Sequence, residues 1–216
     1  MKLICRFIFL IALLFSGIAL ADDTLLQDKS ASQQLLSLLK NIKSLQATFV
    51  QESYDAKNTL LQKQNGNFKV TEKGEFVWNI QAPYEQKIIS DGKTIKIFDP
   101  DLEQLTIKPI DKKTQVIPLL LFSGDSEALT KQYNVSSSSA DVYTLSAQNK
   151  NSLFDNLQIS FKEGKPDALT IIDSMKQKTL VRFSEVDINQ TINASSFLFE
   201  APKGVDVIDE RKIDEH

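Results

Sequence analysis

The chain has 216 residues, of which 25 are basic and 28 acidic, and its formal net charge is −3. This acidic balance argues against nucleic acid as a partner, because binding to phosphate backbones needs an excess of Lys and Arg. The one cysteine is Cys5 and the one histidine is His216, which excludes Ser-His-Asp and Cys-His catalytic sites and an ordinary structural zinc site. We therefore expect no metal and no cofactor.

The first 21 residues have the pattern of a secretory signal peptide. Lys2 and Arg6 precede an apolar run over 7–20, and Ala19-Leu20-Ala21 forms a small-residue cleavage site. Removing this segment leaves 23 basic against 28 acidic residues, a net charge of −5, and takes away the only cysteine. An exported chain without disulfides suits a bacterial periplasm. We expect residues 22–216 to form a single domain there.

The elements begin with a helix and continue as strands. Leu35, Leu39, Ile42 and Phe49 belong to an apolar stripe that predicts an amphipathic helix over residues 32–49, capped by Ser30 or Ser32. Short alternating segments separated by turn residues then predict an antiparallel meander. Its strands are expected at about 48–51, 60–64, 67–71, 75–80, 86–90, 94–98 and 102–108, with Asn65-Gly66 as one of the turns.

The pattern changes between residues 111 and 130. This segment holds the apolar run Leu119-Leu120-Leu121-Phe122 just after Pro118, which predicts one or two short helices inserted in the sheet. Strands resume at about 132–136, 142–147, 156–161, 168–173 and 179–186. The whole pattern predicts a mainly β (α+β) protein, an incomplete antiparallel β-barrel of about eleven strands covered by a helical lid.

Five apolar residues on neighbouring strands form the candidate binding face: Phe76, Trp78, Ile80, Ile95 and Ile97. Such a face is also what an ordinary protein core looks like. A sheet of about eleven strands, however, is wider than an eight-stranded barrel that fills itself with side chains. A cavity lined by these residues would bind an apolar ligand.

The acidic residues Asp99, Asp101 and Glu103 leave a second interpretation open. A pair of carboxylates is the catalytic equipment of glycosidases. The same residues around Pro100 also fit a solvated hairpin turn.

Several motifs together resemble the outer-membrane lipoprotein carrier family over nearly the whole chain after the signal peptide. They are Gly74-x-Phe76-x-Trp78, Ser90-Asp91-Gly92-Lys93, the run FDPDLEQ at 98–104 and the closing FxFxxPxGVDV from Phe197, together with the opening LLxxLxxLQATFxQ passage. The resemblance implies a periplasmic, non-enzymatic chaperone with acylated lipoproteins as cargo. It also implies two partners, an inner-membrane lipoprotein-releasing ABC-transporter complex (LolCDE-like) and an outer-membrane receptor (LolB-like) or its equivalent. We expect the chain to act as a monomer.

The resemblance implies a movable lid, for which we expect Leu39, Ile42, Leu119, Leu120, Leu121 and Phe122 to supply the apolar side chains. Family members commonly carry Arg-Pro-Gly before the Phe-x-Trp strand, and the Arg is the expected lid latch. This chain has Glu72-Lys73-Gly74 instead. Ionised Glu72 cannot donate a hydrogen bond, so Lys73 is the possible latch. A lipid-binding or lipoprotein-binding sensor remains the alternative function.

Overall fold

The computed structural model describes residues 22–110, 121–122, 126–149, 152 and 154–212. Its centre is one twelve-stranded sheet with the order β12-β6-β5-β4-β3-β2-β1-β11-β10-β9-β8-β7. The strands are β1 (Ser44–Tyr54), β2 (Leu60–Thr71), β3 (Glu75–Ala82), β4 (Gln86–Asp91), β5 (Thr94–Asp99), β6 (Gln104–Pro109), β7 (Tyr133–Ser139), β8 (Val142–Ala147), β9 (Asn156–Lys162), β10 (Lys165–Ile172), β11 (Lys178–Ile188) and β12 (Asp206–Asp209). The helices are α1 (Asp22–Lys40), α3 (Ser126–Gln132) and two short 3-10 helices, η1 (Ala194–Phe197) and η2 (Glu210–Lys212).

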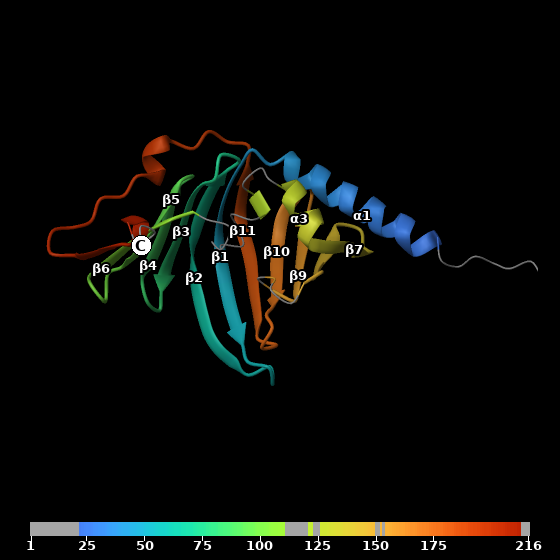
Figure 1. Cartoon of the computed structure of the whole chain (residues 1–216), viewed down its shortest axis with the longest axis horizontal. Coiled ribbons are helices and arrows are strands. Elements are labelled where there is room, and N and C mark those ends of the chain that lie inside the picture. Colours follow the sequence, from blue (N-terminus) through green and yellow to red (C-terminus); the bar gives the residue numbers. More distant parts are fainter. Residues whose placement is uncertain (1–21, 111–120, 123–125, 150–151, 153, 213–216) are drawn as a thin grey trace, which may run out of the picture.

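The predicted mainly β architecture is confirmed, with two corrections to the strands. β1 to β11 pair antiparallel as expected, but β12 is an unpredicted twelfth strand and pairs parallel to β6. The sheet is not closed, because it ends at β12 on one side and β7 on the other. The strands fan out in a strongly curved sheet, and α1 and α3 lie together on the side of β7 (Figure 1).

The predicted first helix is wrong at both ends. α1 already includes Ser30 and Ser32, so neither residue caps it, and it ends at Lys40. From Ser44 onward the chain pairs with both β2 and β11, and Leu45, Ala47 and Phe49 alternate as buried residues. The same apolar residues fit the helical stripe and the strand alternation, and the two neighbouring strands decide the outcome.

The predicted turn at Asn65-Gly66 is also wrong, since β2 runs through it with only a register shift. Gly66 is needed at this position because a Cβ atom would lie 2.0 Å from the backbone oxygen of Asn79. The ring of Phe49, whose backbone pairs with Gly66, occupies the space a side chain would fill. Glycine within a strand often marks such a close approach.

Each face of the sheet has its own apolar cluster. The inner face forms the main core together with α1. On the outer face, Val77 and Ile89 pack against Phe197 of the segment that carries η1. The same segment is also bonded to β5, because Lys96 Nζ donates to the backbone oxygen of Phe199 at 2.7 Å. The chain after β11 is thereby fastened across the back of β3, β4 and β5.

Candidate functional site

The cross-strand register places all five predicted binding residues on the inner face. Trp78 lies opposite Phe68 on one side and Ile88 on the other, and Ile88 lies opposite Ile97. The next row joins Phe76, Ser90 and Ile95. Residues two apart on a strand share a face, so these rows and Ile80 line the same surface.

The binding residues differ in how deeply they are covered. Phe76 and Ile95 are fully buried, and Trp78 and Ile80 are nearly so, whereas Ile97 is half-buried at the margin. Phe76, Trp78 and Ile80 belong to the main core, to which α1 also contributes. The face is therefore largely covered by the chain itself.

A group of aromatic rings forms the centre of the face. The rings of Phe49 and Trp78 stack with centroids 4.0 Å apart, and Phe68 lies 5.2 Å from Trp78 and 5.1 Å from Phe183. Offset and tilted arrangements of this kind add to the stability that burial alone gives. These rings form an apolar platform contributed by four strands, β1, β2, β3 and β11.

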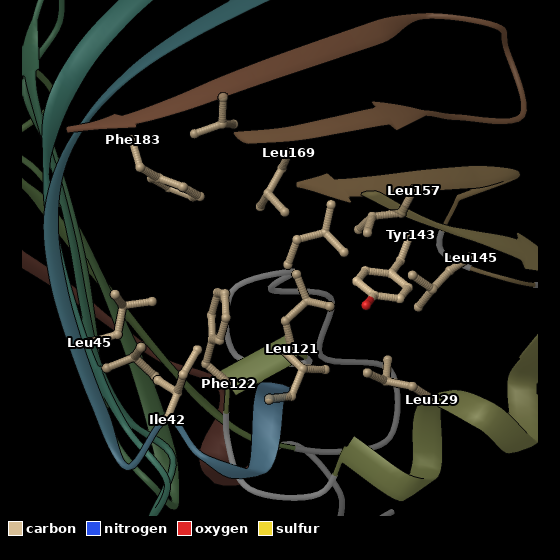
Figure 2. Packing of buried hydrophobic residues seen from close by; sticks show 14 of the residues in the cluster. Ile42, Leu45, Leu121, Phe122, Leu129, Tyr143, Leu145, Leu157, Leu169 and Phe183 are labelled. Carbon is tan, nitrogen blue, oxygen red and sulfur yellow. The ribbon is translucent and has the colours of Figure 1, made fainter. Parts of the chain in front are cut away.

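The second half of the face comes from β8 to β11 and was not predicted as part of the site. Tyr143, Leu157, Leu169 and Phe183 all point into the same interior (Figure 2). The alternation Leu157, Ile159, Phe161 in the sequence indicates this face, since all three are buried in β9. What the sequence lacks is the pairing of β1 with β11, which places the two halves side by side.

The cover of the inner face comes from α1 and from the segment before β7. Ala31, Leu35 and Leu39 form an i, i+4, i+8 stripe on α1 and are buried. Leu121 and Phe122 point between the sheet and the helices, near Ile42 and Leu129 (Figure 2). Four of the predicted lid residues, Leu39, Ile42, Leu121 and Phe122, thus belong to one buried cluster. Leu119 and Leu120 lie outside the described residues.

The inner face carries one buried polar side chain within the described part of the chain, Ser90. Its Oγ donates to the backbone oxygen of Gly74 at 2.9 Å and accepts from the N–H of Gly92 at 3.0 Å. The first bond fastens the β2–β3 turn to β4, and the second lies within the β4–β5 turn. Ser90 is therefore occupied in holding the fold and adds no reactive group to the face.

The candidate latch lies at the β2–β3 turn. Lys73 is exposed, and no hydrogen bond or ion pair of its side chain is seen within the described residues. Its neighbour Glu72 does have a partner, because Lys43 Nζ lies 2.8 Å from Glu72 Oε2. Lys43 lies just after the end of α1, so this ion pair joins the end of the helix to the turn. Both side chains are largely exposed, and such pairs contribute about 0–1 kcal/mol.

The carboxylates of the glycosidase interpretation lie in the β5–β6 hairpin, away from the inner face. Asp99 Oδ1 accepts from the N–H of Leu102 at 3.1 Å, which is an ordinary turn bond. Asp101 and Glu103 are exposed. This arrangement is that of a solvated turn.

Two further properties of the described residues bear on the site. No described helix has the length and apolar character needed to cross a membrane. Within the same residues, no group of three or more His, Cys, Asp or Glu side chains is placed to hold a metal ion.

Comparison with known proteins identifies the family. The family model described as outer membrane lipoprotein carrier protein LolA matches residues 40–200. An outer-membrane lipoprotein carrier protein of Pseudomonas entomophila is 38% identical over 201 residues, covering 92% of this chain and 97% of the relative. One of Chromohalobacter salexigens is 37% identical over 182 residues, covering 83% and 87%.

The fold has a counterpart among solved structures. The crystal structure of an uncharacterized conserved protein from Thermus thermophilus superposes with a TM-score of 0.53 at 11% identity, covering 82% of this chain and 98% of that one. Identity this low supports the fold alone. The family model and the relatives carry the assignment, and the chain belongs to the LolA family of outer membrane lipoprotein carrier proteins.

Proposed function

We propose that this protein is a periplasmic carrier that binds the acyl chains of lipoproteins on the inner face of its sheet. The observation that carries the proposal is the continuous apolar inner face, in a chain that belongs to a family of non-enzymatic lipoprotein carriers. Phe76, Trp78, Ile80, Ile95 and Ile97 would contact the acyl chains.

The energy of an acyl chain in water explains why a carrier needs such a face. Each methylene group removed from water contributes about 0.8 kcal/mol, so one long chain contributes roughly 12 kcal/mol. A carrier has to offset most of this energy and still release the cargo. An incomplete barrel whose lid is made of its own apolar side chains meets both needs, because the lid side chains and the acyl chains compete for the same surface.

The lid in this proposal consists of α1 and the segment around Leu121 and Phe122. In the absence of cargo these side chains cover the face, which keeps a large apolar surface out of water. Cargo would displace them and take their place. Lid closure would then rest on apolar burial, with Lys73 as the possible latch.

The direction of transport would come from partners. An inner-membrane releasing complex would load the carrier, and an outer-membrane receptor with higher affinity for the acyl chains would unload it, while the carrier acts as a monomer. The lipoprotein moves from one protein to the next only as far as the next one binds it more tightly.

Competition for the inner face tests the proposal. The purified protein is loaded with a hydrophobic fluorescent probe and titrated with an acylated lipoprotein or with the same lipoprotein lacking its acyl chains. We expect the acylated form alone to displace the probe. Equal displacement by both forms would refute acyl-chain binding. Retention of lipoproteins in the inner membrane after depletion of the protein is the expected cellular result.

A further inference from the structure

Two turns with the same hydrogen-bond pattern lie at one end of the sheet. In the β1–β2 turn, Asp55 Oδ1 accepts from the N–H of Lys57 at 2.9 Å and of Thr59 at 2.8 Å. In the β10–β11 turn, Asp173 Oδ1 accepts from the N–H of Met175 at 2.9 Å and of Gln177 at 2.8 Å. The fourth residue of each turn has a φ of 63°. We call residues 55–61 and 173–178 together the twin-turn tip.

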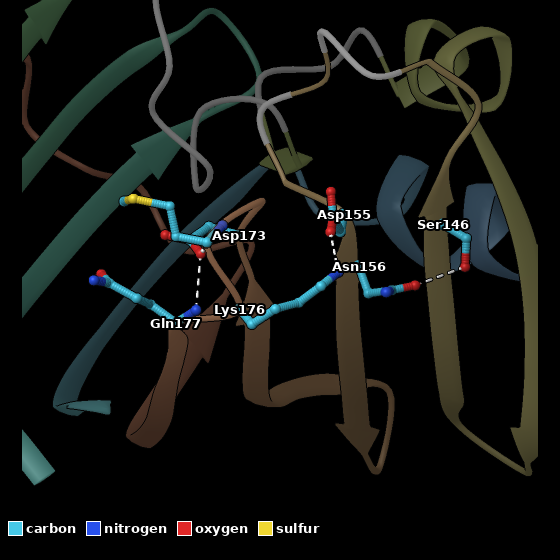
Figure 3. A network of polar contacts seen from close by, with 7 residues as sticks. Ser146, Asp155, Asn156, Asp173, Lys176 and Gln177 are labelled. Carbon is cyan, nitrogen blue, oxygen red and sulfur yellow. Dashed lines mark hydrogen bonds and ion pairs between the residues drawn. The ribbon is translucent and has the colours of Figure 1, made fainter. Parts of the chain in front are cut away.

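The two turns lie side by side and are joined. Tyr54 pairs with Lys178 across β1 and β11, and Lys178 Nζ lies 4.4 Å from the centre of the Tyr54 ring and 2.5 Å from Asn58 Oδ1. Asp155, before β9, forms an ion pair with Lys176 at 2.6 Å, and Asp173 is bonded to Gln177 (Figure 3). The β1–β2 hairpin is the part of the sheet that reaches furthest at its lower end (Figure 1).

The twin-turn tip displays apolar side chains to solvent. Leu60 is 50% exposed, Leu61 58% and Met175 67%. The backbone of Met175 is fixed by its hydrogen bond to Asp173, so its exposure is a property of a well-bonded turn. Exposed apolar residues that gather in one place mark contact surfaces, whereas scattered ones need no explanation.

Cationic side chains surround these apolar residues. Lys57 is exposed, and Lys63 and Lys176 have side chains that are 61% and 66% exposed. The carboxylates nearby are engaged: Glu52 with Lys63 and Arg182, and Asp155 with Lys176. Asp55 and Asp173 face their own backbone N–H groups. Lys176 is balanced by Asp155, whereas Lys63 and Arg182 share the single carboxylate of Glu52. No ion pair of Lys57 or Lys178 is seen within the described residues. The tip therefore keeps an excess of positive charge on a chain that is acidic overall.

We propose that the twin-turn tip docks on the surface of a lipid bilayer that contains anionic phospholipid. Protruding Leu and Met side chains with flanking lysines are a combination that binds the boundary between headgroups and acyl chains. A protein partner is less well matched, because the apolar residues protrude from the tip. The inference rests on the proposed carrier function, since docking would bring the inner face close to the membrane that gives or takes the cargo.

Vesicle flotation tests the proposal with the full-length mature chain. The wild-type protein is expected to float with vesicles of phosphatidylethanolamine and phosphatidylglycerol, and to float about tenfold less with phosphatidylcholine alone. The triple variant Leu60→Ser/Leu61→Ser/Met175→Ser is expected to lose about tenfold in vesicle binding. The matched control is Leu198→Ser, because Leu198 is 73% exposed but lies in the outer segment next to η1.

The outcomes separate this proposal from the carrier function. Failure of the wild type to float, or equal flotation of wild type and triple variant, overturns bilayer docking. Displacement of the hydrophobic probe by an acylated lipoprotein, measured on the same triple variant without vesicles, is expected to match wild type. Loss of that displacement in the wild type would instead refute acyl-chain binding.

Discussion

At the scale of single residues, Glu52 shows how a charge is stabilised on the outer face. Its carboxylate lies 3.0 Å from Lys63 Nζ and 3.1 Å from Arg182 Nη1, and it accepts a hydrogen bond from the Tyr54 hydroxyl at 3.0 Å. The bonds to Lys63, Arg182 and Tyr54 lower the pKa of Glu52 from 4.5 to about 2. Bonds to the charged form of a carboxyl favour that form.

This lowered pKa predicts an acid dependence of stability. A carboxyl with a depressed pKa in the folded state stabilises the protein above its unfolded pKa near 4.5, and this contribution disappears as the pH falls toward about 2. We expect Glu52→Gln to be less stable than wild type at pH 6, with the difference shrinking at pH 3. Urea unfolding at the two pH values measures it. An equal difference at both would contradict the assignment, and Arg182→Met serves as a second variant that weakens the same cluster.

Gly66 predicts a large effect of a very small change. In Gly66→Ala the added methyl group would meet the backbone oxygen of Asn79 at 2.0 Å, and backbone cannot move aside as a flexible side chain does. We expect a loss of about 3 kcal/mol or more in the free energy of unfolding. Gly164→Asn is the control, because nothing lies within 4 Å of that position and Asn tolerates its φ of +74°. Equal stability of Gly66→Ala and wild type would contradict the close approach.

At the scale of elements, variants can distinguish the apolar cover over the inner face from the polar contacts at the β2–β3 turn. Phe122 is 2% exposed, and burial of such a side chain contributes about 1.5–3 kcal/mol. We expect Phe122→Asp to open the cover, which raises the fluorescence of a hydrophobic dye and speeds hydrogen exchange in α1. Leu198→Asp, at a residue 73% exposed, should change neither.

The latch variants complete this experiment. Lys73→Ala and Glu72→Ala should leave exchange in α1 close to wild type, because Lys73 is exposed and the Lys43–Glu72 pair is largely solvated. A marked rise of α1 exchange in Lys73→Ala, with Phe122 unchanged, would show that Lys73 is the latch.

The elements also show where prediction from the sequence ends. Strand alternation correctly predicts that Phe76, Trp78 and Ile80 share one face, because the two-residue alternation is a property of the strand itself and needs no distant partner. The end of α1 depends on β11, which pairs with β1 from residues more than a hundred positions away. β12 is missed because its four residues acquire a strand conformation from β6, and Val207 and Ile208 remain exposed there. Long-range pairing of this kind is absent from any local window of sequence.

At the scale of the whole molecule, cargo and cover are expected to exclude each other. If acyl chains take the place of Leu121, Phe122 and Leu129, loading should free the segment that contains them. We therefore expect hydrogen exchange in α3 and the C-terminal half of α1 to rise when an acylated lipoprotein is bound, while exchange in β1, β2 and β3 falls. The unacylated lipoprotein is the control. A fall of exchange in all of these elements would mean that cargo binds without displacing the cover.

The two free edges of the sheet bear on how bulky a bound molecule it can accommodate. A closed barrel has a fixed circumference, because every strand is bonded to two neighbours and widening it breaks a complete ladder of hydrogen bonds. Here β7 and β12 end the sheet and are not bonded to each other. A change of curvature moves these two edges apart while every ladder stays intact. If acyl chains bind on the inner face, we expect the open sheet to adapt to anchors of different bulk at little cost in backbone hydrogen bonding.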